Sequence, residues 1–182
     1  MIERLLLAAL AMMTVPAHAA DPASNISLSG KSSVAIPLTR APDGKMFLNA
    51  KIQGQPVTLL LDTGASQIVD TVAARRLGLQ CQDTPEAGYG LIGTVDKAQA
   101  TLINLDLDGL NVWQVRATCL DLSGLRAAFQ HHREPLPDGI LSAEVMALLR
   151  ARIDYDRRTL ELRLPTKSSV AEELRRREPA KP

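Results

Sequence analysis

Hydrophobic residues near the middle of the chain recur with the period of two that β-strands show. Residues 46–52 place apolar side chains at every second position, which predicts a strand with one buried face. Residues 53–56 (Gln-Gly-Gln-Pro) have the composition of a turn. Residues 57–61 end in a continuous apolar run, which is typical of a strand buried on both faces. The three segments together predict a hairpin.

Two more hairpins are predicted further along the chain. Asp108-Gly109 favours a two-residue hairpin turn between alternating residues 103–107 and a return strand over 110–119. The residues expected on one face of that return strand are Trp113, Val115, Ala117 and Cys119. The last hairpin is predicted from strands over 152–155 and 160–164.

Two short helices are predicted between the strands. Asp70 is a suitable N-cap for a helix over 71–77, and Gly78 follows as a C-terminal stop. Residues 142–149 predict the second helix. Because short, closely spaced strands dominate, the pattern indicates an all-β barrel with two short helices.

The first 19 residues have the pattern of a secretory signal peptide. A short charged start precedes the apolar residues 5–13, and Ala17-His18-Ala19 is an A-x-A cleavage site. A membrane anchor is the alternative, but the apolar run is shorter than the roughly 20 residues that span a bilayer. We expect cleavage after Ala19, a periplasmic or secreted protein, and no stable membrane insertion after cleavage.

Two polar segments flank the predicted domain. Residues 20–33 are small and polar and are interpreted as a flexible linker. Residues 167–182 are too charged to have an apolar face and are interpreted as a solvated tail, with a weak contact to an acidic surface as the alternative. The domain is therefore predicted over residues 34–166.

Composition and length limit the classes of function. The chain has 21 Lys+Arg against 20 Asp+Glu, so it lacks the basic excess typical of nucleic-acid binding. Aromatic residues make up only 3%, which argues against stacking platforms for bases. The 182 residues suit one domain and are too few for an enzyme that needs two similar lobes in one polypeptide.

Cys81 and Cys119 are the two cysteines of the chain. Disulfides persist in oxidising compartments, so export favours a bridge between them. Such a bridge would close a loop of roughly 40 residues and contribute about 4 kcal/mol in the chain-entropy description. Two buried free thiols are the alternative.

The candidate chemistry lies at Asp62, directly after the predicted buried strand. A carboxylate in that position is costly unless it is paired or hydrogen-bonded. Gly64 is expected to let the backbone turn sharply and bring amide groups near the carboxylate. Thr63 offers a hydroxyl that can bond to a neighbouring loop. An ordinary turn after a strand is the alternative interpretation.

The stretch from Phe47 to Asp70, with Asp62-Thr63-Gly64-Ala65-Ser66 inside it, resembles the retropepsin-like aspartic proteases, in particular their bacterial exported branch. The resemblance continues at Ile140-Leu141, which a short helix and a final hairpin follow. The resemblance implies a retropepsin-like closed acid-protease barrel, with the chain as a single-lobe subunit. One departure is Ser142, where the family usually carries Gly.

The resemblance implies two aspartates around one water molecule, acting as general acid and general base on a peptide bond. The chain has one Asp-Thr-Gly, so the second aspartate is expected to be Asp62 of an identical subunit in a twofold dimer. Thr63 and Gly64 would shape the loop, and Ala65 would line the substrate site. The family also implies a flap, which is expected near Tyr89 and Gly90. A peptide or protein substrate is implied, and no cofactor or metal is required.

Two other motifs are weaker. Residues 88–93 match G-x-G-x-x-G, but no strand precedes them and no helical pattern follows, so glycines of a flap hairpin are favoured over a dinucleotide site. His131-His132 are interpreted as part of a solvated loop, because adjacent histidines point differently and lack metal-ligand spacing.

The sequence thus predicts an exported, homodimeric aspartic endopeptidase. A protein of another class remains open: a catalytically silent module that uses the same barrel and groove to bind a peptide or support assembly.

Overall fold

A computed structural model describes residues 26–84, 88–90, 93–95, 98–131 and 135–165. The predicted signal peptide over 1–19 and the predicted tail over 167–182 lie outside these ranges. Within them, no helix has the length and apolar character needed to cross a membrane.

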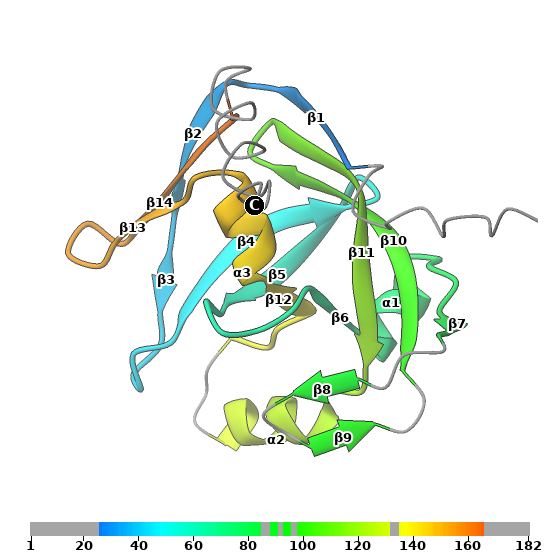
Figure 1. The fold of residues 1–182 in the computed structure, drawn as a ribbon. Coiled ribbons are helices and arrows are strands. Elements are labelled where there is room, and N and C mark those ends of the chain that lie inside the picture. The colour runs from blue at the N-terminus through cyan, green and yellow to red at the C-terminus, as the bar shows by residue number, and fades with distance from the viewer. Residues whose placement is uncertain (1–25, 85–87, 91–92, 96–97, 132–134, 166–182) are drawn as a thin grey trace, which may run out of the picture.

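Six strands close into a barrel at the centre of the fold (Figure 1). They are β4 (Met46–Ile52), β5 (Gln55–Leu61), β6 (Ile68–Asp70), β10 (Gln99–Leu107), β11 (Leu110–Leu120) and β12 (Gly139–Leu141). Around the ring, β4 pairs with β5, β5 with β12, β12 with β6, β6 with β11, β11 with β10, and β10 with β4. The β5–β12 and β6–β11 pairs are parallel and the others are antiparallel. The predicted all-β closed barrel is confirmed by this pairing.

The other elements surround the barrel. The remaining strands are β1 (Ser27–Gly30), β2 (Ser33–Pro37), β3 (Thr39–Arg40), β7 (Gln82–Asp83), β8 (Gly88–Gly90), β9 (Gly93–Val95), β13 (Arg152–Asp154) and β14 (Thr159–Arg163). Strands β13, β14 and β2 form a separate sheet, and β8 and β9 form a two-stranded hairpin (Figure 1). The helices are α1 (Thr71–Arg76), α2 (Ser123–His131) and α3 (Ala143–Leu148).

The alternation in β4 sends its side chains into two separate apolar clusters. Leu48 and Ile52 belong to the large cluster, which also takes in buried residues of β5, β10 and β11. Phe47 points to the opposite side and packs in a smaller cluster with Leu60 and Phe129. Burial of each large apolar side chain contributes on the order of 1.5–3 kcal/mol, so both faces of β4 stabilise the barrel.

The linker predicted over residues 20–33 is wrong for the part that the structure describes. Strand β1 pairs antiparallel with β11, in register from Ser27 with Trp113 to Gly30 with Leu110. Ile26 and Leu28 also pack against the large apolar cluster. The small, polar composition concealed a strand whose stability comes from hydrogen bonds to a partner far away in sequence.

The predicted common face of the β11 return strand is also wrong at Trp113. The register shifts between the Ile103–Val115 pair and the Leu105–Val112 pair. Over this interval β10 advances by two residues and β11 by three. The extra residue is Gln114, which has φ +59° and donates its backbone N–H to Asn104 Oδ1 at 3.0 Å. This β-bulge reverses the alternation, so Trp113 is 40% exposed while Val115 is buried.

Helix α2 is a third helix that the sequence pattern did not predict. It lies in the segment between β11 and β12 and carries His131 at its last position, so the loop interpretation of His131 is wrong. His132 lies outside the described residues. The apolar face of α2 consists of only Leu125 and Phe129, which pack in the smaller cluster. Two large apolar side chains in nine residues are too few for the helical period to be recognised in the sequence.

The predicted turn and cap signals form as expected. Asp108 and Gly109 have φ of +56° and +87°, the left-handed values that a two-residue hairpin turn requires. Asp70 caps α1, and Gly78 follows the helix with φ +71°. Helix α1 therefore starts and ends where its sequence signals place it.

Candidate active site

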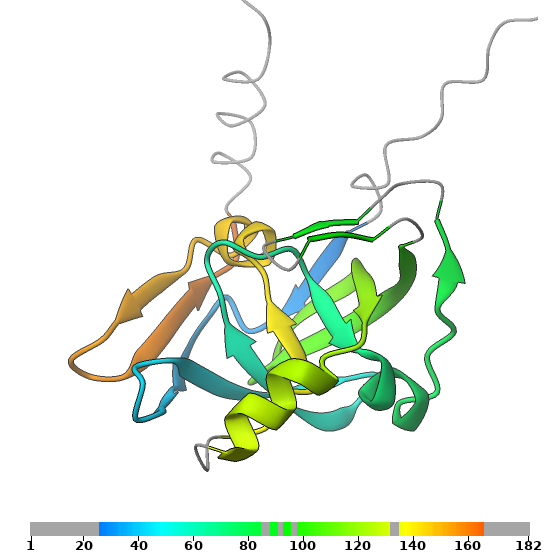
Figure 2. The ribbon, with the colours of Figure 1, turned by 90° about the horizontal axis from the view of Figure 1, so that it is seen from below.

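The loop over residues 62–67 joins β5 to β6 and holds Asp62 at the edge of the barrel. Figure 2 shows this loop next to α3. The backbone N–H of Asp62 donates to Leu141 O at 3.3 Å, which ties the loop to the end of β12. The N–H of Gly64 donates to Asp62 Oδ1 at 2.8 Å. The half-buried carboxylate is therefore oriented by its own loop while it remains reachable from solvent.

Gly64 does not make the sharp backbone turn that its lack of a side chain predicts. Its φ is not in the left-handed region, so the backbone does not depend on glycine for a sharp turn. A Cβ added there would touch only Asp62 Oδ1, at the ordinary contact distance of 3.5 Å. What the chain uses at this position is the backbone N–H, which any residue but proline supplies.

The residues beside Asp62 differ in exposure. Thr63 and Ser66 are exposed polar residues. Ala65 is half-buried and packs against the smaller apolar cluster. Its carbonyl accepts a hydrogen bond from the N–H of Ala143 at 3.1 Å. The loop thus presents polar groups on its outer side and is anchored to α3 on its inner side.

Gln67 closes the loop and was not singled out by the sequence patterns. Its side chain is buried, with 5% exposed. Its Nε2 donates to Ile140 O at 2.7 Å, and its Oε1 accepts from the N–H of Ser142 at 3.2 Å. A single glutamine among many polar residues carries no motif, so only the tertiary contacts identify it.

Ser142, the departure from the family pattern, is explained by helix α3. It is fully buried, and its Oγ accepts from the N–H of Val145 at 3.1 Å as the N-cap of the helix. The glycine that the backbone does require is Gly139, three positions earlier. A Cβ there would lie 2.4 Å from Ile68 O, so β12 and β6 approach more closely than any side chain allows.

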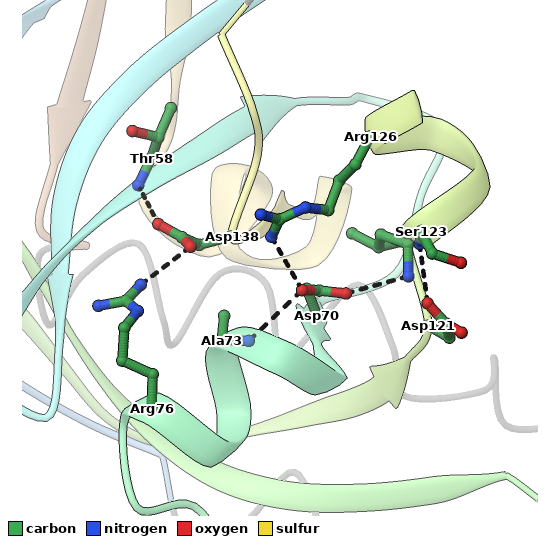
Figure 3. Close-up of polar contacts among 9 residues, drawn as sticks. Thr58, Asp70, Ala73, Arg76, Asp121, Ser123, Arg126 and Asp138 are labelled. Carbon is green, nitrogen blue, oxygen red and sulfur yellow. Dashed lines mark hydrogen bonds and ion pairs between the residues drawn. The ribbon is translucent and has the colours of Figure 1, made fainter. Parts of the chain in front are cut away.

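Asp70, the last residue of β6, is a second carboxylate of the barrel, and it is fully buried (Figure 3). Its Oδ1 accepts from the N–H of Leu122 at 3.0 Å, and its Oδ2 accepts from the N–H of Ala73 at 3.4 Å. Arg126 of α2 pairs with it, Nη1 to Oδ2, at 3.1 Å. Asp70 therefore joins the starts of α1 and α2, and its charge is neutralised by Arg126.

Figure 3 also shows Asp121 and Asp138 beside this network. The N–H of Ser123 donates to Asp121 Oδ1 at 2.8 Å and holds the pKa of that carboxyl below its usual value. Asp138 accepts from the N–H of Thr58 at 3.0 Å and pairs with Arg76 at 2.9 Å. Both carboxylates are therefore bound by groups of the same subunit.

Cys81 and Cys119 form a disulfide, with their Cα atoms 6.1 Å apart. The bridge joins the start of β7 to the end of β11. Directly beyond it, the N–H of Thr84 donates to Ala98 O at 2.8 Å and closes the segment that contains β8 and β9.

Tyr89 and Gly90 lie in β8, where they pair with Thr94 and Gly93 of β9. The G-x-G-x-x-G string therefore spans a hairpin rather than the junction of a strand and a helix, and a dinucleotide site lacks its required context. Figure 2 shows the hairpin at the same edge of the molecule as the loop after β5. A contact of Tyr89 and Gly90 with substrate stays a prediction.

Other sites receive little support in the described part of the chain. No group of three or more His, Cys, Asp or Glu residues is arranged to hold a metal ion there. A surface hollow between the β4–β5 and β10–β11 turns contains none of the residues 62–67. Its charges already form ion pairs, Lys31 with Asp108 at 3.1 Å and Lys51 with Asp106 at 3.7 Å.

A protein-family model described as aspartyl protease matches residues 48–145, which is more than half of the chain. The chain therefore belongs to the aspartyl protease family. The matched range contains the Asp62 loop, Gln67 and β12. No curated protein matches the chain.

Among solved structures, the chain is similar to a retropepsin-like aspartic protease from Rickettsia conorii. The two share 19% identity over 76% of this chain and 92% of that one, with a TM-score of 0.47. It is also similar to the EIAV protease complexed with the inhibitor HBY-793. Here the identity is 20% over 64% of this chain and 98% of that one, again with a TM-score of 0.47.

Proposed function

We propose that the protein is an aspartic endopeptidase that acts as a homodimer. The observation that carries the proposal is the Asp62 carboxylate, which the N–H of Gly64 orients at 2.8 Å on a loop with an exposed outer side. The carboxylates of Asp70 and Asp138 lie by the start of β12, at the opposite end of the β5–β12 pair from Asp62, and each is paired with an arginine and bonded to backbone N–H groups. Neither is a suitable second acid, which favours Asp62 of an identical subunit in that role.

The proposed mechanism follows from two carboxylates placed close together. Like charges at that distance disfavour double ionisation, so the pair of Asp62 groups shares one proton. The ionised carboxylate accepts a proton from a water molecule, which attacks the peptide carbonyl carbon. The protonated carboxyl donates its proton to the carbonyl oxygen. Thr63, which is exposed, would bond across the twofold axis through its hydroxyl and hold the two loops in one plane.

We also propose that the substrate is a peptide or protein covered by the β8–β9 hairpin, with Tyr89 and Gly90 in contact with it. Ala65, which lies in the same loop as Asp62, would line the site. The proposed location is the periplasm or the outside of the cell, after removal of residues 1–19. The disulfide between Cys81 and Cys119 supports an oxidising compartment.

The test compares the protein of residues 20–182 with its Asp62→Asn variant on a peptide library, at several concentrations and from acidic to neutral pH. Asp156→Asn, an exposed change in the β13–β14 turn, is the matched control. We expect turnover by the wild type and the control, none by Asp62→Asn, and a specific activity that rises with concentration as dimers form.

Solution mass measured alongside activity separates the outcomes. A folded, dimeric wild type that is as inactive as Asp62→Asn over the whole pH range would contradict the protease proposal. If that inactive dimer still binds peptides, the protein is the catalytically silent peptide-binding module that the sequence left open. A folded protein that stays monomeric at every concentration would overturn both shared-site versions.

A further inference from the structure

Gln67 stands apart from the other buried polar side chains. The described part of the chain buries three polar or charged residues, namely Gln67, Asp70 and Ser142. Asp70 caps α1 and Ser142 caps α3. Gln67 caps no helix in that part of the chain. Both ends of its carboxamide instead bond to the junction of β12 and α3, at Ile140 O within β12 and at the N–H of Ser142, the cap of α3.

The carboxamide acts as a substitute for a peptide group. Like a peptide, it places an N–H donor and a carbonyl acceptor in one plane, and here one of its two N–H groups and its oxygen make these two bonds. The backbones of β6 and β12 pair as far as Ile68 with Ile140, and Gln67 lies one residue before that pair. Its side chain carries the contact on to Ser142, beyond the point where the two backbones separate. Only one orientation of the amide satisfies both partners, because Ile140 O needs a donor and the Ser142 N–H needs an acceptor.

We propose that Gln67 is a positioning residue for Asp62, a role that rests on the proposed function. The other bonds between the loop and this junction, from the N–H groups of Asp62 and Ala143, use backbone atoms that almost any sequence supplies. The bonds of the Gln67 side chain require this residue. They fix the end of the loop that leads into β6, while β5 fixes the end that begins at Asp62.

The experiment uses two substitutions of nearly equal size, Gln67→Met and Gln67→Glu. Gln67→Met removes both bonds at every pH. Gln67→Glu keeps the acceptor for the Ser142 N–H, but it can donate to Ile140 O only when its carboxyl is protonated. The same two substitutions at the exposed Gln55 of β5 are matched controls, because they change the same atoms without a buried partner.

We expect Gln67→Met to lower kcat by about tenfold at all pH values with little change in KM, the size of effect that loss of a buried hydrogen bond produces. Gln67→Glu shows the same loss at neutral pH and recovers as the pH falls. The folded state favours the protonated form, so the pKa of the introduced carboxyl is raised. The stability of this variant relative to the wild type therefore falls as the pH rises above the unfolded value of about 4.3.

The contributions of other titrating groups to the pH dependence cancel when each variant is compared with the wild type. The charged side chains of the segments that contact Gln67 are Asp62, Asp70, Arg116 and Glu144. All four are present in every variant, and each variant is compared with the wild type at the same pH. The Gln55 variants are expected to follow the wild type throughout.

Hydrogen exchange of the Ser142 N–H supplies a readout that needs no catalysis. Relative to the wild type at the same pH, we expect faster exchange in Gln67→Met at all pH values. In Gln67→Glu, repulsion between the ionised carboxylate and Ile140 O also weakens the bond to the Ser142 N–H, so the exchange is faster at neutral pH and returns toward the wild-type rate in acid. If neither variant changes the exchange, Gln67 only fills space. If both variants have the same pH-independent loss, the bond that Gln67 donates to Ile140 O does not fix the loop. Either result means that the inference is wrong.

The two proposals fail in different ways. An inactive wild type with the expected Ser142 exchange pattern contradicts the protease while Gln67 keeps its role in fixing the loop. An active wild type whose Gln67 variants match it in kcat contradicts the positioning role and leaves the protease in place. If Gln67→Met does not fold, the acid recovery of Gln67→Glu decides the question alone.

Discussion

Asp62, Asp70 and Asp138 carry the same charge but have different surroundings. Asp62 is half-buried and receives one N–H bond from Gly64. Asp70 is fully buried and joins two helices with the help of Arg126. Asp138 links β5 to α1 through its bonds to backbone and arginine. Only the carboxylate of Asp62 is both oriented and open to a ligand, so its difference from the other two comes from their partners rather than from the residue type.

Removal of one partner tests this distinction. Arg126→Met keeps the length of the side chain but leaves the buried charge of Asp70 without its counter-ion. We expect a loss of about 2–4 kcal/mol in the free energy of unfolding, measured by denaturant titration. The control is Arg157→Met, which breaks an exposed pair with Asp154 and is expected to change stability by less than about 0.5 kcal/mol. Equal effects of the two variants would mean that the Asp70 pair behaves as a surface pair.

At the scale of elements, the site depends on how closely β6 and β12 approach. Their pairing at Val69 with Gly139 and at Ile68 with Ile140 brings the end of β12 behind the Asp62 loop. Helix α3 then starts directly from β12 with Ser142 as its cap. The short strand and the short helix work as one support, because the strand contributes the backbone and the helix start contributes the N–H groups that hold the loop.

Substitution by alanine is expected to destabilise the subunit at Gly139 of β12 and to be tolerated at Gly64 of the loop. In Gly139→Ala the new Cβ would lie 2.4 Å from Ile68 O, a backbone atom of β6 that cannot move aside as a flexible side chain can. We expect a loss of about 2–4 kcal/mol in the free energy of unfolding. In Gly64→Ala the new Cβ has an ordinary contact at 3.5 Å, so the stability of the subunit is expected to change by less than about 1 kcal/mol.

Activity separates the two variants further. The Gly64 position faces outward beside Asp62, where the proposed second subunit and the substrate approach. Gly64→Ala should therefore lose turnover or dimer mass while it keeps the stability of the subunit, measured by unfolding and by solution mass in parallel. A Gly64→Ala protein with full activity would indicate that nothing packs against this side of the loop.

On the scale of the whole molecule, the chain supplies one Asp-Thr-Gly loop and a barrel closed by contacts far apart in sequence. The disulfide joins residues 38 positions apart and secures the base of the segment that includes the β8–β9 hairpin. If the proposed dimer forms, catalysis depends on association and therefore on protein concentration. Stability of the subunit and completeness of the site are then separate properties.

Replacing both cysteines tests the contribution of the bridge. The double variant Cys81→Ser with Cys119→Ser is expected to lose about 4 kcal/mol in the free energy of unfolding, because the unfolded chain regains the freedom of the closed loop. Denaturant titration of the wild type with and without a reductant should give the same difference. Unfolding midpoints that are unaffected by reductant would show that the bridge adds nothing to stability.

The sequence by itself determined the elements whose signals are local. Alternating residues predicted β4, the Asp108-Gly109 pair predicted its hairpin, and Asp70 with Gly78 marked the ends of α1. The motif around Asp62 also identified the candidate site, because its residues are contiguous and the family match includes them.

Only the tertiary structure decided what depends on distant partners. The outward turn of Trp113 follows from a bulge against β10, and β1 is a strand because β11 pairs with it. Gln67 is indistinguishable from surface glutamines until its carboxamide meets the junction of β12 and α3. The physical reason is common to all three. A hydrogen bond to a distant segment leaves no periodic trace in the residues near it, so its effect becomes visible only when the barrel closes.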